Sequence, residues 1–255
     1  MTAPFSGKSI LITGAGSGIG RATAIKFASL GATLHLSDLH LTSVSATATL
    51  CQSARGSRAT PRVAALDVRD PQACNAYVAA IANVAAPTPC IHHVFNCAGV
   101  NPTAVPIADV TDEYWDRVLD TNLKGTFNVT RAVTPHLSSG ASFVNVSSIC
   151  GLVPSSHFAV YCAAKYAIIG FSKCLALELG PRGIRTNVVA PGYIDTPTNV
   201  AVLQGEQEVK RMEERVAMGR FGRKEEVADV VVFLMSAEAR YVNGSVVEVN
   251  GGMGF

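Results

Sequence analysis

Short apolar segments alternate with longer helix-like stretches along the whole chain, and this alternation restricts the possible folds more than any other feature. Most of the short segments are apolar at successive positions, as parallel strands with helices on both faces are. The pattern therefore predicts an α/β fold, with a doubly wound, seven-stranded parallel sheet flanked by helices. The predicted strands are Ser9–Thr13, Thr33–Ser37, Arg62–Leu66, His92–Asn96, Ser142–Val146, Arg185–Val189 and Ser245–Val249. The predicted helices are Gly18–Leu30, Leu41–Ala54, Pro71–Val84, Glu113–Leu137, Ala159–Leu179, Glu206–Ala217 and Lys224–Ser236.

No linker rich in proline or serine divides the chain, so we expect one domain over residues 1–255. The least regular stretch follows the sixth predicted strand, from Pro191 onward. Ligands of such sheets lie beyond the carboxyl ends of the strands. Residues 191–217, approximately, are therefore predicted to cover a substrate site.

Composition limits the partners that the chain can have. Its 255 residues are 48% hydrophobic and 16% charged, and the formal net charge of +2 is too small to indicate a nucleic-acid or membrane surface. The first residues do not read as a secretory signal, and no uncharged apolar run is long enough to cross a membrane. The seven cysteines are odd in number and form no CxxC pair, so neither a disulfide framework nor a zinc site is indicated. Reduced thiols are typical of a cytoplasmic protein, which is the location that we expect.

The first predicted strand runs into a glycine-rich segment, Ile10-Leu-Ile-Thr-Gly-Ala-Gly-Ser-Gly-Ile-Gly20, and a predicted helix follows. Glycines allow a tight turn and let the backbone approach a pyrophosphate, while the helix offers free N–H groups and the positive end of its dipole. Glycine turns are common, but this one lies at the first strand-to-helix junction, where such binding requires it. The segment therefore predicts a Rossmann-type dinucleotide site.

Asp38 lies 18 residues after Gly20, at the end of the second predicted strand. A carboxylate there can accept hydrogen bonds from both ribose hydroxyls of an adenosine, and it repels a 2′-phosphate. The alternative is a helix-capping or turn aspartate. No Arg or Lys follows nearby, since the neighbours are Ser37, Leu39 and His40. NAD(H) is therefore the preferred cofactor, and NADP(H) stays open because His40 could assist a phosphate.

A second group of residues indicates proton transfer. Tyr161 and Lys165 are four residues apart on a predicted helix, so they share a face. A free tyrosine has a pKa of about 10, and an adjacent cation is expected to lower it. Ser148 follows the fifth predicted strand, and Asn122 lies in a predicted helix. Each alone is explained by structure, as a core aromatic, a strand-end cap or an ordinary polar residue, but their ordered occurrence behind the glycine-rich turn favours a catalytic site.

Together these motifs resemble the short-chain dehydrogenase/reductase family. The resemblance spans nearly the whole chain, from Thr13-Gly-Ala-Gly-Ser-Gly-Ile-Gly20, through Asn96-Cys-Ala-Gly99, to Val249-Asn-Gly-Gly252. It implies an NAD(P)-dependent oxidoreductase whose catalytic residues are Asn122, Ser148, Tyr161 and Lys165. The cofactor-binding residues that it implies are Gly14, Ser17, Gly18, Ile19, Gly20, Asp38, Asp67, Val68, Asn96, Tyr161, Lys165, Ile194 and Thr196.

The resemblance also implies a mechanism and an assembly. Hydride would pass between a nicotinamide and a ketone or secondary alcohol, with Tyr161 as general acid/base and Ser148 bonded to the reacting oxygen. Lys165 would hold the nicotinamide ribose, and Asn122 would interrupt its helix to hold a water that relays protons. A homotetramer would pack through the helices that carry Asn122 and Tyr161, with Gly251–Phe255 near another interface.

Fold alone does not fix chemistry, so two other functions stay open. One is a nicotinamide-dependent reaction without net redox change, such as a dehydration, an epimerisation or a cyclisation, which hydride balance would separate. The other is a nucleotide-binding sensor, against which the intact set of Ser148, Tyr161 and Lys165 argues.

Two cysteines depart from the expected surroundings of the site. Cys97 stands where the family usually has a second asparagine, and we expect a minor change in local hydrogen bonding. Cys162 directly follows Tyr161, and we interpret it as a buried helix residue rather than an oxidation-sensitive thiol.

The segments that flank the site suggest a largely apolar pocket for a small carbonyl or alcohol substrate. His157 lies in a turn-like run and either hydrogen-bonds a substrate oxygen or lies at the rim. The residues that suggest the apolar pocket are Val153, Pro154, Phe158, Tyr193, Val200, Val202 and Leu203.

Overall fold

The computed structural model describes residues 3–55, 60–85, 91–196 and 205–253. Seven parallel strands form one sheet in the order β3-β2-β1-β4-β5-β6-β9, and β7 pairs with β8 apart from it. The seven-stranded parallel sheet that the sequence predicts is therefore confirmed. The strands are β1 (Ser9–Thr13), β2 (Thr33–Asp38), β3 (Arg62–Ala65), β4 (Ile91–Asn96), β5 (Leu137–Val146), β6 (Arg185–Pro191), β7 (Ile194–Asp195), β8 (Gly222–Arg223) and β9 (Val246–Val249).

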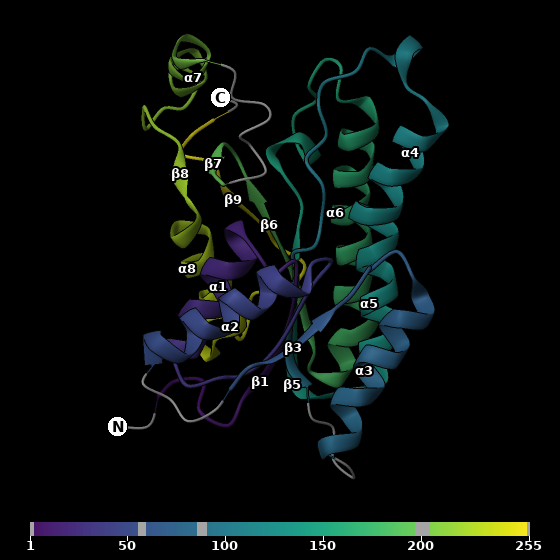
Figure 1. Ribbon diagram of the computed structural model, residues 1–255, viewed down its shortest axis with the longest axis vertical. Coiled ribbons are helices and arrows are strands. Elements are labelled where there is room, and N and C mark those ends of the chain that lie inside the picture. Colours follow the sequence, from purple (N-terminus) through teal and green to yellow (C-terminus); the bar gives the residue numbers. More distant parts are fainter. Residues whose placement is uncertain (1–2, 56–59, 86–90, 197–204, 254–255) are drawn as a thin grey trace.

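Helices cover both faces of the sheet (Figure 1). One layer holds α1, α2 and α8, while α3, α5 and α6 form the other layer and α4 packs against α6. The helices are α1 (Gly18–Ser29), α2 (Leu41–Arg55), α3 (Pro71–Ala85), α4 (Asp112–Leu119), α5 (Gly125–Val133), α6 (Ala159–Leu179), α7 (Glu206–Glu213) and α8 (Lys224–Met235). The single-domain prediction spans residues outside the described ranges and stays a prediction.

The strand β1 shows how the core divides between the two layers. Ile10 and Ile12 pack with α1, α2 and α8, whereas Leu11 packs with α3, α5 and α6. All three side chains are fully buried. Successive residues of a strand face opposite sides, so only a continuous apolar run can fill both interfaces.

The predicted helix Glu113–Leu137 is wrong as one continuous element. The chain forms α4, a π-helical turn at Asp120–Lys124, then α5 and a 3₁₀ turn. The remainder joins β5, which begins at Leu137 opposite Ile91 of β4. The predicted helix Glu206–Ala217 ends earlier as well, at Glu213.

The strand order reverses beside β1, because β2 lies on one side of it and β4 on the other. Such a switch point opens a crevice at the carboxyl ends of the strands. Of the described helices, α6 with its following turn (Ala159–Arg182) is the one long and apolar enough to cross a membrane by length and composition. Here it packs against the sheet as a layer helix.

Candidate active site

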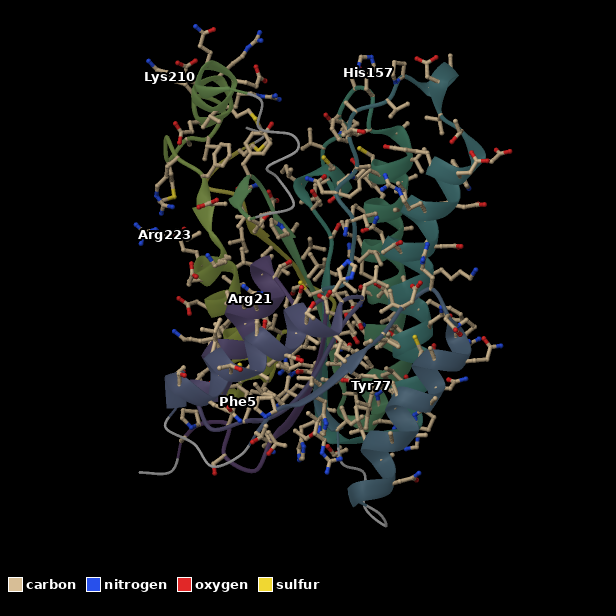
Figure 2. The ribbon with its side chains drawn as sticks, viewed as in Figure 1. Phe5, Arg21, Tyr77, His157, Lys210 and Arg223 are labelled. Carbon is tan, nitrogen blue, oxygen red and sulfur yellow. The ribbon has the colours of Figure 1, made fainter. Side chains whose placement is uncertain are left out.

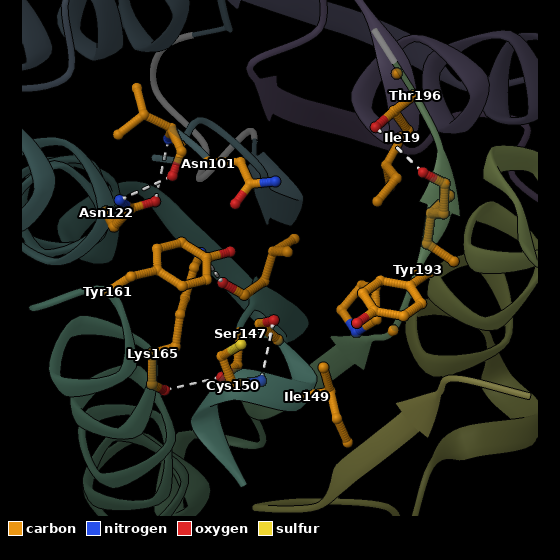
Figure 3. A pocket seen from close by; sticks show the side chains of 18 of the residues that line it. Ile19, Asn101, Asn122, Ser147, Ile149, Cys150, Tyr161, Lys165, Tyr193 and Thr196 are labelled. Atoms are coloured by element: carbon orange, nitrogen blue, oxygen red, sulfur yellow. Dashed lines mark hydrogen bonds between the residues drawn. The ribbon is translucent and has the colours of Figure 1, made fainter. Parts of the chain in front are cut away.

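A cavity of about 1010 Å³ opens beyond the carboxyl ends of the central strands. Of the sequence-predicted site residues, it is lined by Gly14, Ser17, Gly18, Ile19, Gly20, Asp38, Asn122, Ser148, Tyr161, Lys165, Ile194 and Thr196. Figure 3 shows Asn122, Tyr161 and Lys165 on one side of this cavity, with Ile19, Tyr193 and Thr196 on the other. The fold therefore brings the predicted catalytic residues and most of the predicted cofactor residues into one space.

The glycine-rich turn between β1 and α1 forms the floor of one end. Gly14 has a φ of +65°, and a Cβ on it would lie 2.8 Å from the backbone nitrogen of Ala98. A Cβ on Gly20 would overlap the carbonyl oxygen of Gly14. Because α1 begins at Gly18, the residues of its first turn that line the cavity present the positive end of the helix.

Asp38 closes the end of the cavity beside this turn. Its carboxylate accepts hydrogen bonds from the backbone N–H of Gly16, at 2.8 Å, and of His40, at 3.2 Å. A Cβ on Gly16 would lie 2.7 Å from the Asp38 carboxyl carbon, so the residue must be glycine for the two to approach. The carboxylate stands where the adenosine ribose hydroxyls of a dinucleotide are expected.

Sequence reasoning missed a basic residue at this end. The guanidinium of Arg21 donates to the carbonyl of Gly16 and, at 3.0 Å, to the hydroxyl of Thr47. The fully buried Thr47 hydroxyl in turn donates to the carbonyl of Ala15 at 2.8 Å. Arg21 therefore fastens the glycine-rich turn to α2, a role signalled only by its place directly after Gly20.

Three predicted cofactor residues do not line the cavity. Asp67 is ion-paired with Arg69 at 2.6 Å, and this hydrogen bond lowers the pKa of the Asp67 carboxyl. Val68 is buried and packs closely against Gly125, since a Cβ added to Gly125 would lie 3.1 Å from the Cβ of Val68. Asn96 is buried and donates to Thr130 and Asn145, which ties β4 to α5 and β5. Their contact with a cofactor stays a prediction.

Ser148 and the Tyr161–Lys165 pair meet where β5 ends and α6 begins. Ser148 precedes a 3₁₀ turn (Ile149–Gly151), and its hydroxyl accepts from the N–H of Cys150 at 3.2 Å. On α6 the ammonium of Lys165 lies 5.5 Å from the ring centroid of Tyr161. It donates to the carbonyl of Val146 at 3.1 Å, and Lys165 as a whole is 5% exposed.

The expected lowering of the Tyr161 pKa is wrong for the chain by itself. Burial raises the pKa of this phenol, and the hydrogen bond with Ser148 opposes that effect only in part. Burial also lowers the pKa of Lys165 to about 8, so the ammonium beside the phenol loses its proton at a lower pH than a free lysine does. Loss of hydration outweighs the adjacent charge, so Tyr161 holds its proton at neutral pH.

Asn122 sits inside the π-helical turn, as the resemblance implied for an interrupted helix. Its side-chain amide donates to the carbonyl of Val118 at 3.0 Å, and its oxygen accepts from the N–H of Val100 at 3.2 Å. A Cβ on Gly99 would lie 2.6 Å from the side-chain oxygen of Asn122 and 3.8 Å from the Lys165 ammonium. Gly99, whose part the sequence did not reveal, therefore keeps open the space between Asn122 and Lys165.

Three thiols surround the Tyr161–Lys165 pair. Cys97 lines the cavity, and burial raises its pKa to about 12. Cys150 also lines it, and burial raises its pKa to about 11. Cys162 is 7% exposed, which confirms its interpretation as a buried helix residue. Protonated thiols at Cys97 and Cys150 act as small apolar groups beside the reacting atoms.

The far end of the cavity has a mostly apolar lining. It includes four of the predicted residues, which are Val153, Pro154, Phe158 and Tyr193, whereas Val200, Val202 and Leu203 lie outside the described residues. The charged residues that α7 and the turn after it add are Glu208, Glu214 and Arg215. Figure 2 places Lys210 of α7 and His157 on opposite sides of this end of the molecule. His157 is exposed and does not line the cavity, so the structure favours its rim position.

The chemistry of the residues fits a nicotinamide dinucleotide. The glycines leave backbone where a pyrophosphate needs close approach, a helix N-terminus faces the same space, and the Asp38 carboxylate suits ribose hydroxyls. The described residues hold no group of three or more His, Cys, Asp or Glu side chains that could bind a metal ion.

Comparisons with known proteins agree with this geometry. Residues 14–254 match the family described as enoyl-(acyl carrier protein) reductase. The chain is 37% identical to 3-oxoacyl-(acyl-carrier-protein) reductase of Thermotoga maritima, over 97% of this chain and 98% of the relative. It is also 35% identical to cyclohexanol dehydrogenase of Acinetobacter, over 98% of this chain and 96% of the relative.

Solved structures give the same result. A glucose/ribitol dehydrogenase of the short-chain dehydrogenase/reductase type from Brucella melitensis superposes with a TM-score of 0.90 at 30% identity, covering 99% of this chain and 98% of that one. Carveol dehydrogenase from Mycobacterium avium in complex with NAD has a TM-score of 0.89 at 27% identity, covering 98% and 99%. A metagenomic blue fluorescent protein in complex with NADPH has a TM-score of 0.89 at 28% identity, covering 99% and 100%.

The chain belongs to the short-chain dehydrogenase/reductase family. Within that family it is an NAD(P)-dependent oxidoreductase that acts on alcohols or ketones.

Proposed function

We propose that the protein uses NAD(H) to interconvert a neutral, apolar secondary alcohol and its ketone, with Tyr161 as the general acid/base. The observation that carries this proposal is the convergence of Ser148, Tyr161 and Lys165 in one cavity, opposite the glycine-rich turn and next to an apolar end. A nicotinamide bound there supplies or accepts the hydride.

In the reduction direction, Tyr161 donates its phenolic proton to the carbonyl oxygen, and the Ser148 hydroxyl hydrogen-bonds the same oxygen as charge develops on it. The raised pKa of Tyr161 suits this step, because the phenol is protonated when the ketone binds. In the oxidation direction Tyr161 must first lose its proton. Alcohol oxidation should therefore rise with pH, while ketone reduction persists at neutral and lower pH.

The preference for NAD(H) rests on Asp38. Its carboxylate repels a 2′-phosphate, and two backbone N–H groups hold it in place. The structure adds the guanidinium of Arg21 to this end, and that group is engaged with the carbonyl of Gly16 in the turn. The test is a titration of nicotinamide fluorescence with NADH and NADPH, for the wild type and Asp38→Ala. Tighter binding of NADH, weakened in the variant, supports the preference, and tighter binding of NADPH by the wild type contradicts it.

The preference for a neutral substrate rests on the lining of the cavity. Its far end is mostly apolar, and the one guanidinium that lines the cavity among the described residues, on Arg215, is accompanied by the carboxylates of Glu208 and Glu214. Anionic carrier groups would meet more negative than positive charge there. The test compares kcat/KM for a cyclic secondary alcohol with that for a 3-hydroxyacyl-CoA. A higher value for the thioester, lost in Arg215→Ala, would overturn the proposed substrate class.

We also propose a homotetramer, for which exposed apolar side chains on α4, α5 and α6 give support. Trp115 is 46% exposed, Phe127 40% and Leu177 81%. Light scattering tests the assembly, and a single monomeric species would refute it.

A cytoplasmic location, with no nucleic-acid or membrane partner, is proposed as well. It is supported by the free thiols of the six cysteines in the described ranges, and cell fractionation tests it.

A further inference from the structure

Ser147 precedes Ser148 and joins the sheet to the helix that carries the Tyr161–Lys165 pair. The residue is only 2% exposed. Its backbone N–H donates to the carbonyl of Val189 at 2.9 Å, which extends the β5–β6 ladder by one bond. Its hydroxyl donates to the backbone carbonyl of Lys165 at 2.8 Å. One residue therefore bonds to the central sheet and to α6 at the same time.

Lys165 is held at both of its ends by consecutive residues of the chain. Ser147 binds its backbone carbonyl, and the carbonyl of Val146 accepts from its ammonium at 3.1 Å. The next residue is Ser148. Two hydrogen bonds therefore fix the position of Lys165 relative to Ser148, and both are made by the two residues that directly precede this serine.

Gly151 permits this close approach of the 3₁₀ turn and α6. A Cβ on Gly151 would overlap the Ser147 hydroxyl and would lie 2.8 Å from the backbone carbonyl oxygen of Lys165. Both bonding partners of the Ser147–Lys165 contact would have to move. The turn after Ser148 is thus packed around this one hydrogen bond (Figure 3).

We propose that Ser147 is a positioning residue, which sets the separation between Ser148 and the Tyr161–Lys165 pair through its hydrogen bond to the Lys165 carbonyl. The inference rests on the proposed function, since it names a residue that acts on the same site through the main chain of Lys165.

The surroundings of Lys165 supply a readout. Its ammonium is flanked by the thiols of Cys97 and Cys150 and by the ring of Tyr161, and burial lowers its pKa to about 8. If the Ser147 bond is lost and α6 moves away from the turn, water reaches the ammonium. The charged form is then better hydrated, so the pKa of Lys165 rises toward its ordinary value of 10.5.

The experiment measures the ionisation of Lys165 directly in the free protein. Lysine labelled with ¹³C is followed by NMR as a function of pH, and Lys165→Met identifies the resonance. The variants are Ser147→Ala, which removes the hydroxyl, and Ser147→Thr, which keeps it. Gly151→Ala disturbs the same contact from the other side. The matched control is Ser172→Ala on α6, because Ser172 is 1% exposed, does not line the cavity and bonds α6 to the sheet at another place. Its hydroxyl donates to the carbonyl of Ile168 at 2.7 Å and accepts from the side-chain amide of Asn145 on β5 at 2.9 Å, with no bond to Lys165.

In Ser147→Ala and Gly151→Ala the Lys165 midpoint should rise by about half a pH unit or more, and kcat for alcohol oxidation should fall by about tenfold or more. Ser147→Thr and Ser172→Ala should keep the midpoint of the wild type. An unmoved midpoint in Ser147→Ala, or an equal rise in Ser172→Ala, overturns the inference. If the wild type oxidises no secondary alcohol, the proposed function fails, whereas the Lys165 titration still decides the role of Ser147.

Discussion

At the residue scale, Tyr161 combines burial with a reactive hydroxyl. Its pKa is raised because the phenolate would lose hydration, while Ser148 supplies a hydrogen bond that favours ionisation in part. The free chain therefore starts with a protonated acid. Any group that adds positive charge beside the phenol on binding shifts the same residue toward acting as a base.

Tyr161→Phe should lower kcat by about 10²- to 10⁴-fold, because the ring stays and only the proton donor is lost. Tyr166→Phe is the matched control on the same helix, since the Tyr166 hydroxyl donates to the carbonyl of Leu152 and the residue does not line the cavity. Steady-state kinetics with a secondary alcohol measure both variants, and comparable rates in the two would exclude Tyr161 as the acid/base.

Gly99→Ala should lower kcat while leaving the fold intact. The added methyl group would lie 2.6 Å from the Asn122 side-chain oxygen and within 3.8 Å of the Lys165 ammonium, so it would fill the space between them. We expect slower proton exchange at Lys165 and a larger solvent deuterium isotope effect on kcat. The control is Gly170→Ala on α6, where a Cβ meets nothing within 4 Å. Wild-type rates in Gly99→Ala would show that this space is not used.

At the element scale, the sequence predicts regular elements better than interruptions. The bounds of α6, Ala159–Leu179, agree with the prediction, because its apolar pattern is long and a glycine follows it. No glycine or proline at Asn122 signals the change from α- to π-helix, because the backbone stays helical there. The turn is held by hydrogen bonds of Asn122 with Val100 and Val118. The contact with Val100 joins two segments that are 22 residues apart in the sequence, so a local pattern does not reveal it.

Local patterns also explain which site residues could be predicted from the sequence and which could not. Ser148, Tyr161 and Lys165 belong to a spaced motif, and the cavity gathers them as expected. The parts of Arg21 and Ser147 depend on which carbonyl each side chain reaches, at Gly16 and at Lys165. A linear pattern does not contain those partners.

Arg21→Leu tests the fastening of the glycine-rich turn to α2. Removing the guanidinium leaves the carbonyl of Gly16 without this donor and frees the turn that bears the Asp38 contact. We expect NADH affinity to fall by about tenfold, the effect of about 1.4 kcal/mol. Fluorescence titration measures the change. Lys26→Leu on the same helix, where the cation pairs with Asp229 at the surface at 2.8 Å, should bind NADH as the wild type does. Equal affinities for all three proteins would refute the role of Arg21.

At the scale of the whole molecule, a second set of titratable groups lies nearer the amino ends of the strands, whereas the cavity lies beyond their carboxyl ends. His35 bonds to the Ser9 hydroxyl at 3.0 Å and His93 to that of Ser142 at 2.8 Å. Burial lowers the pKa of His35 to about 4 and holds the pKa of His93 well below 6.5. Phe5, 5.7 Å from His93, marks this end of the molecule, opposite Lys210 and His157 in Figure 2.

The protein should therefore lose stability in mild acid. Both histidines bind protons more readily in the unfolded chain, so their contribution is complete above pH 6.5 and decreases as the pH falls toward 4. Each should remove about 2 kcal/mol between pH 6.5 and pH 5. Urea unfolding at the two pH values measures this, and His93→Gln should reduce the difference. His40→Gln, at an exposed position, is the control, and an unchanged difference in His93→Gln would contradict the assignment.

The short pairing of β7 with β8 has a consequence for how this protein can change. Ile194 lies opposite Gly222 and Asp195 opposite Arg223, so this pairing holds together, outside the main sheet, the two ends of a stretch that contains most of the segment predicted to cover the substrate site. The chain between β7 and β8 therefore leaves and returns at the same place in the molecule. We expect that substitutions confined to this stretch change which substrates the protein accepts. The catalytic residues and the main sheet would keep their sequence and their positions.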